Sequence, residues 1–401
     1  MEDEKVRKEA AQKRVLKYLP VFIITALVFL VVSACSGTAT TAPAPNPTDM
    51  PSDMPGMDMS GGNQPTPTAM PATMPGMDMG NEAQPTAIPG AMDMGGSLMQ
   101  DEPVSSEGVL PATENEGGQL LPYTLDGEVK VFELTAKPVL WNINPDTQAT
   151  AWTYNGTVPG PLFRVTEGDK VRVIFKNTLP DPTSIHWHGL PVASNMDGVS
   201  QPELSQPPVM PGETFTYEFE AKPAGTFMYH SHFDTDTQIN VGLFGGFIIE
   251  PKDWAETKPD QDITLILNEW RVIDGVTYPA MPSMGEPNFF TVNGKTYPDI
   301  PTINVKQGER VRIRFIGAGQ FEHPMHLHGM PFKIVATDGY LVPEVAQLTK
   351  DVVPVHPGER FDIEFVADNA GQWAFHCHIV HHATNDDVEP GGLLFVVNVE
   401  P

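Results

Sequence analysis

The stretch "FHCHIVHH" at residues 375–382 places one cysteine and four histidines in eight consecutive positions. All twelve histidines of the 401-residue chain lie at or after position 186, and most of them occur in clusters. The other clusters are "HWH" at 186–188, "HSH" at 230–232 and "HPMHLH" at 323–328. Imidazole and thiolate groups are ligands for transition metals such as copper and zinc. The clusters therefore predict metal sites.

The spacing of the clustered histidines sorts their side chains into two groups. Residues i and i+2 of a β-strand share a face, whereas residue i+1 points the other way. We therefore expect Cys377 to point away from its two histidine neighbours. His323, an odd step before His326, and His382, beyond the strand end, can turn to the side of the cysteine. One site then has two imidazoles and a thiolate. The other site has eight imidazoles from four H-x-H pairs: His186 and His188, His230 and His232, His326 and His328, and His376 and His378.

The donor set with one thiolate indicates copper rather than zinc. Two histidines and one cysteine with a weak axial ligand are the donors of a blue-copper electron-transfer site. A structural zinc site needs more thiolates than Cys35 and Cys377 can supply, and a three-histidine catalytic zinc site would leave five or more imidazoles unexplained. Each cysteine has its own local context, so we expect no disulfide between them. His356 and His381 lie outside the pattern and are expected at the surface or in loops.

The elements that must position these residues are short β-strands. From about Pro122 onward, runs such as "KVRVIFKN", "ITLILNEW" and "RVRIRFIG" are separated by Gly, Pro and Asn, which predicts an all-β sandwich or barrel. The chain also repeats itself. "VTEGDKVRVIFKN", "HWHG" and "GTFMYHSH" correspond to "VKQGERVRIRFIG", "HLHG" and "GQWAFHCH". The repeat predicts two β domains, at residues 122–255 and 256–401, with histidine clusters at matching places.

Residues 1–35 have the layout of an export signal. A stretch with Lys and Arg precedes an apolar run from Leu19 to Ala34, which ends in small residues before Cys35. The run is short for a bilayer span and contains Pro20, although a retained membrane anchor is the alternative. "VSAC" resembles the lipobox of bacterial lipoproteins, in which the cysteine carries the lipid. We expect an exported protein, periplasmic or at the cell surface, anchored through lipidated Cys35.

Residues 36–121 predict a disordered linker, because Pro, Gly, Thr, Ser and Met dominate and cannot form a packed core. The segment holds eleven of the nineteen methionines, and "MPGMDM" occurs twice. Thioethers select Cu(I), so the linker either binds copper or is a plain spacer that uses Met. The formal net charge of −27 argues against nucleic-acid binding, which needs a basic surface.

Over about residues 125–400 the sequence resembles the multicopper oxidases, the laccase-like family built from cupredoxin domains. The resemblance lies in "HWHG", "YHSH", "HPMHLHG" and "HCHIVHH". It implies two tandem cupredoxin-like Greek-key β-sandwich domains and four coppers per chain. It assigns a type 1 copper to His323, Cys377 and His382, and a type 2 copper to His186 and His326. It assigns the two type 3 coppers to His188, His230, His232, His328, His376 and His378.

The sequence departs from the family pattern after the last type 1 histidine. The loop "ATNDDVEPG" is longer than in most relatives, and Leu393, or alternatively Leu394, occupies the axial position. A non-coordinating axial residue should raise the copper potential. Ala383 replaces an acid that often follows the histidine. Asp197 in "NMDGVSQ" matches the family's acid beside the cluster, where it would orient water or pass protons; the alternative is a plain turn Asp-Gly.

The resemblance implies an oxidase that takes electrons one at a time from a phenolic or aromatic donor and reduces dioxygen to water. Ser231 stands where Cys377 stands in the second half, so one type 1 site per chain is expected. For a chain with only two domains, the resemblance implies a homotrimer whose trinuclear sites lie between the first domain of one chain and the second domain of its neighbour. Three alternatives stay open: a Cu(I) oxidase for copper tolerance, a copper nitrite reductase, and a non-enzymatic copper-binding lipoprotein.

Overall fold

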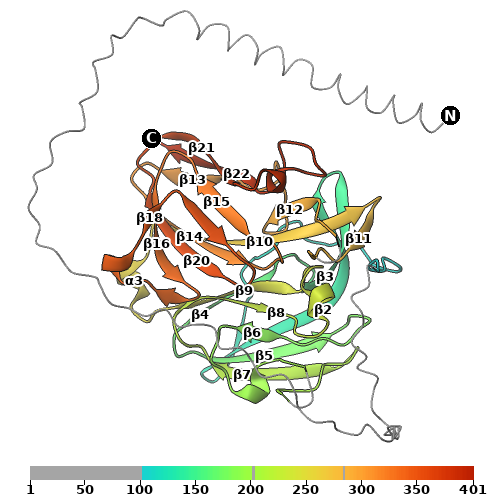
Figure 1. Ribbon diagram of the computed structural model, residues 1–401. Helices are drawn as coiled ribbons and strands as arrows, with labels where there is room; N and C mark the ends of the chain where they lie inside the picture. Colours follow the sequence, from blue (N-terminus) through green and yellow to red (C-terminus); the bar gives the residue numbers. More distant parts are fainter. Residues whose placement is uncertain (1–101, 201–203, 283–284) are drawn as a thin grey trace, which may run out of the picture. The chain divides into compact units, whose positions relative to one another are not determined.

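The computed structural model describes residues 102–200, 204–282 and 285–401 (Figure 1). The predicted signal segment, Cys35 and the linker as far as residue 101 lie outside the described residues. The described chain consists mainly of β-strands joined by turns and a few short helices, which confirms the predicted all-β class. None of its helices is long and apolar enough to cross a membrane.

The first half of the described chain forms two sheets. One has the order β1-β2-β5-β7 with β3 paired to β2, and the other has the order β4-β9-β8-β6. In β5, Val171, Val173 and Phe175 are buried while Lys170 and Lys176 are exposed, because alternate side chains of a strand face the core. The bounds are β1 Thr124–Asp126, β2 Val129–Asn144, β3 Thr147–Tyr154, β4 Gly160–Thr166, β5 Lys170–Asn177, β6 His186–His188, β7 Thr214–Glu220, β8 Gly225–His230 and β9 Phe244–Glu250.

The second half also forms two sheets. One has the order β11-β10-β14-β20-β16-β17 with β12 on β10 and β18 on β16, and the other has the order β13-β22-β21-β15-β19. The bounds are β10 Gln261–Ile273, β11 Val276–Tyr278, β12 Phe289–Val292, β13 Ile303–Lys306, β14 Arg310–Gly317, β15 His323–Leu327, β16 Phe332–Thr337, β17 Tyr340–Leu341, β18 Thr349–Lys350, β19 Val352–Val355, β20 Arg360–Val366, β21 Gly371–Cys377 and β22 Leu394–Glu400. The short helices are η1 Ser194–Met196, α2 Thr235–Gln238, α3 Trp254–Thr257, η2 Glu344–Ala346 and η3 Val380–Ala383.

The strand pairings of the two halves repeat each other. β2 runs parallel to β5 as β10 does to β14, and β4 runs parallel to β9 as β13 does to β22. β6 pairs with β8 as β15 pairs with β21, and these are the strands that carry the H-x-H motifs. The sequence repeat is therefore a repeat of topology. The predicted domain boundary at 255 and 256 stays a prediction; it falls within α3.

A buried ion network connects the two halves. Arg314 on β14 lies 2.8 Å from Asp362 on β20 and 2.7 Å from Asp262 on β10, and all three side chains are at most 4% exposed. Thr226 on β8 of the first half donates to Asp362 at 2.7 Å and accepts from Arg314 at 2.7 Å. Arg164 on β4 of the first half also lies 3.0 Å from Asp262, so separation of the halves would take a cation from a buried carboxylate, which is costly.

The predicted disorder does not extend over residues 102–121. The amide of Val104 donates to the carbonyl of Thr277, and that of Leu121 donates to the carbonyl of Leu162, both at 2.9 Å. The side chains of Val104 and Leu121 are buried. Composition predicted disorder here because the segment has few apolar residues, but backbone hydrogen bonds to existing strands depend little on composition.

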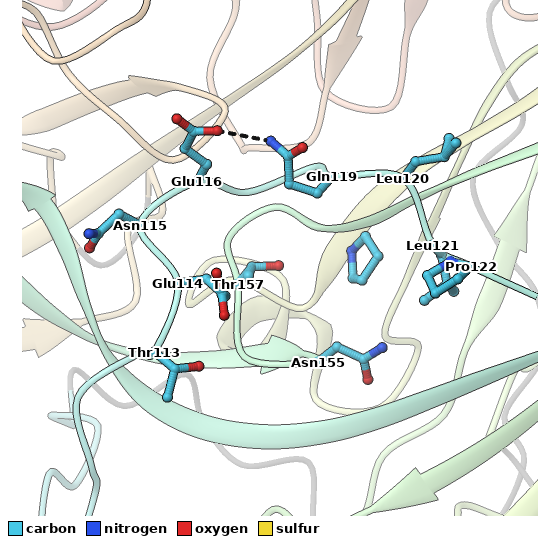
Figure 2. A pocket seen from close by; sticks show the side chains of 11 residues that line it. Thr113, Glu114, Asn115, Glu116, Gln119, Leu120, Leu121, Pro122, Asn155 and Thr157 are labelled. Atoms are coloured by element: carbon cyan, nitrogen blue, oxygen red, sulfur yellow. Dashed lines mark hydrogen bonds between the residues drawn. The ribbon is translucent and has the colours of Figure 1, made fainter.

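The same segment borders a cavity of about 640 Å³, shown in Figure 2. Side chains from Thr113 to Pro122 line it together with Asn155 and Thr157, and Glu116 accepts a hydrogen bond from Gln119 at 3.2 Å. None of the predicted metal ligands lines this cavity.

Candidate metal centres

Three of the predicted ligands converge inside the second half, and we call this group the thiolate site: His323 on β15, Cys377 at the end of β21 and His382 in η3. Nδ1 of His382 lies 3.1 Å from Nδ1 of His323 and 3.6 Å from Sγ of Cys377. All three residues are buried. Ligands about 2.0–2.3 Å from one ion lie roughly 3–4 Å apart, so these donors fit a single metal ion.

Strand alternation separates Cys377 from its neighbours, as expected. Across the β15–β21 pair, Met325 lies opposite Cys377 and His326 lies opposite His376. Successive residues therefore face opposite sides of the sheet. Cys377 is buried, whereas His376 is half-buried and His378 is exposed.

Burial favours the uncharged forms of Cys377 and His382 at the thiolate site. Burial raises the pKa of the Cys377 thiol to about 12 and lowers the pKa of His382 to about 3. A neutral imidazole offers a lone pair to a metal, whereas the thiol must lose its proton when a metal binds. The ring of Phe290 stacks on that of His382 with centroids 4.2 Å apart.

Leu393 lies beside this site. The Cys377 amide donates to the Leu393 carbonyl at 2.9 Å, and the Leu393 amide donates to the His382 carbonyl at 2.8 Å. Leu393 is fully buried, whereas Leu394 is partly exposed and pairs with His376 on the other face of the sheet. The backbone therefore favours Leu393 over Leu394 for the axial position.

Four histidines of the first half form the first histidine set. The ring of His186 lies 5.2–5.7 Å from the other three rings, and Nδ1 of His188 lies 3.2 Å from Nε2 of His230. Burial lowers the pKa of His188 to about 4 and that of His230 to about 3. The set consists of His186, His188, His230 and His232.

Four histidines of the second half form the second histidine set. The ring of His326 lies 4.8–5.7 Å from the other three rings, and Nε2 of His328 lies 3.1 Å from Nε2 of His376. The set consists of His326, His328, His376 and His378, so Cys377 lies in the chain between two of its members.

Backbone carbonyls fix the tautomers of corresponding histidines in both sets. A carbonyl can only accept, so the Nδ1 atom facing it carries the proton and Nε2 keeps the lone pair for a metal. The two sets use the same positions for this. The pairs are His186 with Asp197 at 2.8 Å, His326 with Asp351 at 2.9 Å, His230 with Ser231 at 2.7 Å and His376 with Cys377 at 3.0 Å.

The two histidine sets do not meet within the part of the chain that the structure describes. They lie on different sheets, and no ring contact or hydrogen bond among the described residues connects them. His328 and His378 of the second set are exposed. Each set therefore offers four nitrogens, half of the eight that the sequence predicts for one site.

Comparison with known proteins identifies the family. Two family models, both described as multicopper oxidase, match residues 135–253 and 274–388. The chain belongs to the multicopper oxidase family. Among solved structures, this multicopper oxidase is 33% identical to the blue copper oxidase from Nitrosomonas europaea, with a TM-score of 0.61. The match covers 67% of this chain and 85% of that one, and it supports tandem cupredoxin-like sandwiches.

Curated relatives carry several names. The chain is 29% identical to a probable nitrite reductase-hydroxylamine oxidoreductase fusion protein of Kuenenia stuttgartiensis, over 65% of this chain and 31% of the relative. It is 30% identical to copper resistance protein A of Pseudomonas syringae pv. tomato, over 58% of this chain and 45% of the relative. It is 33% identical to laccase-20 of Oryza sativa subsp. indica, over 60% of this chain and 44% of the relative. The chain thus spans less than half the length of these relatives.

In the first half of this multicopper oxidase, a polar triad occupies the position that corresponds to the thiolate site. Ser231 occupies the position equivalent to Cys377. The amide of Ser231 donates to the carbonyl of Leu243 at 3.1 Å, just as the amide of Cys377 donates to the carbonyl of Leu393. Oε1 of Gln238 accepts from Ser231 at 2.5 Å and from Thr183 at 2.7 Å. Hydroxyl and amide groups thus saturate each other where the second half has metal donors.

Sequence reasoning missed Glu269 on β10. Its fully buried carboxylate lies 2.5 Å from Nε2 of His323. The available signal was an acidic residue inside the apolar strand "ITLILNEW", because an acidic side chain is rarely buried without a partner.

The remaining histidines lie at the surface, as expected. His356 is 47% exposed between Glu322 and Glu359, and its hydrogen bond to Glu359 raises its pKa. His381 lies 3.3 Å from Asp387 on the surface loop. Cys377 is the free cysteine of the described residues.

Proposed function

We propose that this multicopper oxidase couples one-electron oxidation of a donor to the four-electron reduction of dioxygen to water. One observation carries the proposal: His376 and His378 belong to the second histidine set, and Cys377 between them belongs to the thiolate site. A donor set for electron transfer is thus one residue away from a donor set for a metal cluster.

The donor sets suit the expected coppers. His323, Cys377 and His382 would hold a type 1 copper with Leu393 as a non-coordinating axial neighbour, since two imidazoles and a thiolate are its usual ligands. His186 and His326 would hold the type 2 copper, and the other six histidines of the two sets would hold the type 3 pair. Bound copper would supply a one-electron acceptor at the thiolate site and the centre for dioxygen reduction at the histidine sets.

The chain supplies a short path between the two kinds of site. The backbone from Cys377 to His376 and His378 is a covalent link. In addition, the His376 ring donates directly to the Cys377 carbonyl at 3.0 Å, which adds a hydrogen-bonded route. With copper bound at both sites, this covalent and hydrogen-bonded path would connect the thiolate site to the second histidine set without crossing solvent.

Asp197 is our candidate for handling protons. Its carbonyl fixes His186, and its carboxylate oxygen lies 3.4 Å from the same Nδ1 atom. The carboxylate is partly exposed, so it lies between solvent and the first histidine set. We propose that it orients water or passes protons to the reduced oxygen.

We further propose a homotrimer in which each cluster lies between two chains. Each set supplies four of eight nitrogens, and the second set is partly open to solvent, so a second copy can complete it. Head-to-tail contacts of this kind form a closed ring when the rotation between neighbouring chains closes, which for three chains is a third of a full turn. The test mixes two inactive variants, His186→Ala and His326→Ala, after dissociation and reassembly. If clusters form between chains, random assembly restores roughly a quarter of them. No recovery in a reassembled trimer would show that the sets combine within one chain.

The donor class is proposed as phenolic or aromatic, in line with the laccase relative. Cu(I) is the second candidate, because the chain also resembles copper resistance protein A. The Met-rich segment that would deliver Cu(I) lies outside the described residues. We also propose that the protein is exported and anchored through lipidated Cys35; membrane fractionation of a Cys35→Ser variant tests this.

The decisive experiment is oxygen uptake by the copper-loaded chain with a simple phenol and, separately, with Cu(I). Cys377→Ser should abolish uptake with either donor, whereas His356→Ala, which removes a histidine outside every donor set, should leave it unchanged. Uptake that survives Cys377→Ser would refute the proposed route. Nitrite reduction in place of oxygen uptake would favour a nitrite reductase, and copper binding without turnover would favour a storage protein.

A further inference from the structure

A buried acidic side chain supports one ligand of the thiolate site. Glu269 has a fully buried side chain, and its Oε1 lies 2.5 Å from Nε2 of His323. Its Oε2 accepts a hydrogen bond from the backbone amide of Gln320 at 3.0 Å. Among the described residues, His323 is the side chain that forms a hydrogen bond with this carboxylate.

The carboxylate decides which nitrogen of His323 is available. Nδ1 of His323 faces Nδ1 of His382, next to the sulfur of Cys377. Nε2 faces the carboxylate, so the proton lies on Nε2 and the lone pair on Nδ1. The ring therefore presents its donor atom to the metal position before any metal arrives.

The residue that contacts His323 lies next to the residue that contacts the other histidine, His382. Glu269 on β10 pairs directly with Phe290 on β12, so the two side chains are cross-strand neighbours on one face. Glu269 holds His323, and Phe290 stacks on His382. Two residues that lie opposite each other in the β10–β12 pair thus orient both imidazoles of the thiolate site.

We propose that Glu269 is a positioning residue of the thiolate site that also lowers the reduction potential of its copper. A carboxylate that accepts the distal N–H of a metal-bound imidazole makes the ring a stronger electron donor. A stronger donor stabilises Cu(II) relative to Cu(I). Glu269 therefore acts against Leu393, whose lack of coordination raises the potential. The inference rests on the proposed assignment of His323, Cys377 and His382 to copper.

The test is the reduction potential of the copper-loaded full chain carrying Glu269→Gln. Glutamine keeps the shape but weakens the acceptor, so the Cu(II)/Cu(I) ratio at a fixed potential should fall at least tenfold, a rise of about 59 mV. Glu322→Gln is the matched control. Glu322 precedes His323 in the chain, but its exposed carboxylate contacts His356 instead. Glu322→Gln should therefore shift the reduction potential by much less than Glu269→Gln does.

The outcomes separate this inference from the proposed function. If the parent chain with copper lacks the visible thiolate absorption, the proposed site itself fails. If the parent shows that absorption but Glu269→Gln moves the potential no more than Glu322→Gln, the role of Glu269 is refuted. Pulsed electron paramagnetic resonance of the parent decides the matter if the variant does not fold. Two inequivalent distal imidazole nitrogens support the inference, since the described residues place a carboxylate only at His323, and two equivalent ones overturn it.

Discussion

Replacing Phe290 by alanine should damage both the stability of the second half and the retention of copper at the thiolate site. The ring of Phe290 is fully buried. It stacks on His382 at 4.2 Å and meets the rings of His323 and His381 edge-on at 6.3 and 5.3 Å. Its removal therefore leaves a cavity against both imidazoles of the site.

The expected loss in the free energy of unfolding is about 3–5 kcal/mol, the usual range for a buried Phe→Ala change. Each ring contact adds about 0.5–1.5 kcal/mol beyond burial, which favours the upper part of that range. At about 2–4 °C per kcal/mol for a large domain, the melting temperature should fall by roughly 10 °C. Copper should also leave faster, because His382 loses the surface that holds its ring.

Phe315→Ala is the matched control for this change. Phe315 is fully buried in the same core but packs on Phe375 rather than on a ligand. Denaturant unfolding of the metal-free chains should give similar losses for both variants. Loss of the thiolate colour to a chelator should be fast only for Phe290→Ala. Equal rates for the two variants, or a stability loss below about 1 kcal/mol for Phe290→Ala, would refute the reasoning.

Three further predictions concern charge and potential. Arg314→Met removes the cation paired with the buried carboxylate of Asp362 and should cost about 3–5 kcal/mol in denaturant unfolding; a loss below about 1 kcal/mol would mean that this carboxylate reaches solvent. Copper must displace the proton of Cys377, whose pKa burial raises to about 12, so the affinity of the thiolate site should increase about tenfold per pH unit near neutrality. Titrations of the parent and of Cys377→Ser check this, and the slope should vanish in the variant. Leu393→Met should lower the copper potential in a redox titration, and an unchanged potential would argue against an axial position.

The sequence predicted the parts of the site that depend on strand alternation. The i and i+2 rule anticipated that Cys377 faces away from His376 and His378, and the internal repeat anticipated the shared topology of the two halves. These features follow from local geometry, so short motifs are sufficient to reveal them. The roles of the individual histidines at copper stay predictions.

Other features depend on contacts between distant segments and were not predicted. Glu269 and His323 are 54 positions apart and meet because β10 and β15 lie in facing sheets of one sandwich. The carbonyls that fix the histidine tautomers belong to the backbone, so no residue type indicates them. The order of residues 102–121 likewise comes from hydrogen bonds to strands that composition does not describe.

In the proposed oxidase, the polar triad of Thr183, Ser231 and Gln238 limits how quickly electrons reach a cluster. In the proposed trimer, each cluster receives electrons from one thiolate site only, since the equivalent position in the first half holds hydrogen bonds instead of metal donors. Dioxygen needs four electrons, and a donor gives them singly. If the proposed reduction of dioxygen holds, each turnover requires four successive encounters with a donor at one thiolate site, and partly reduced clusters must persist between encounters. A relative with metal donors in both halves could receive electrons at two sites at once, so its clusters would be fully reduced sooner.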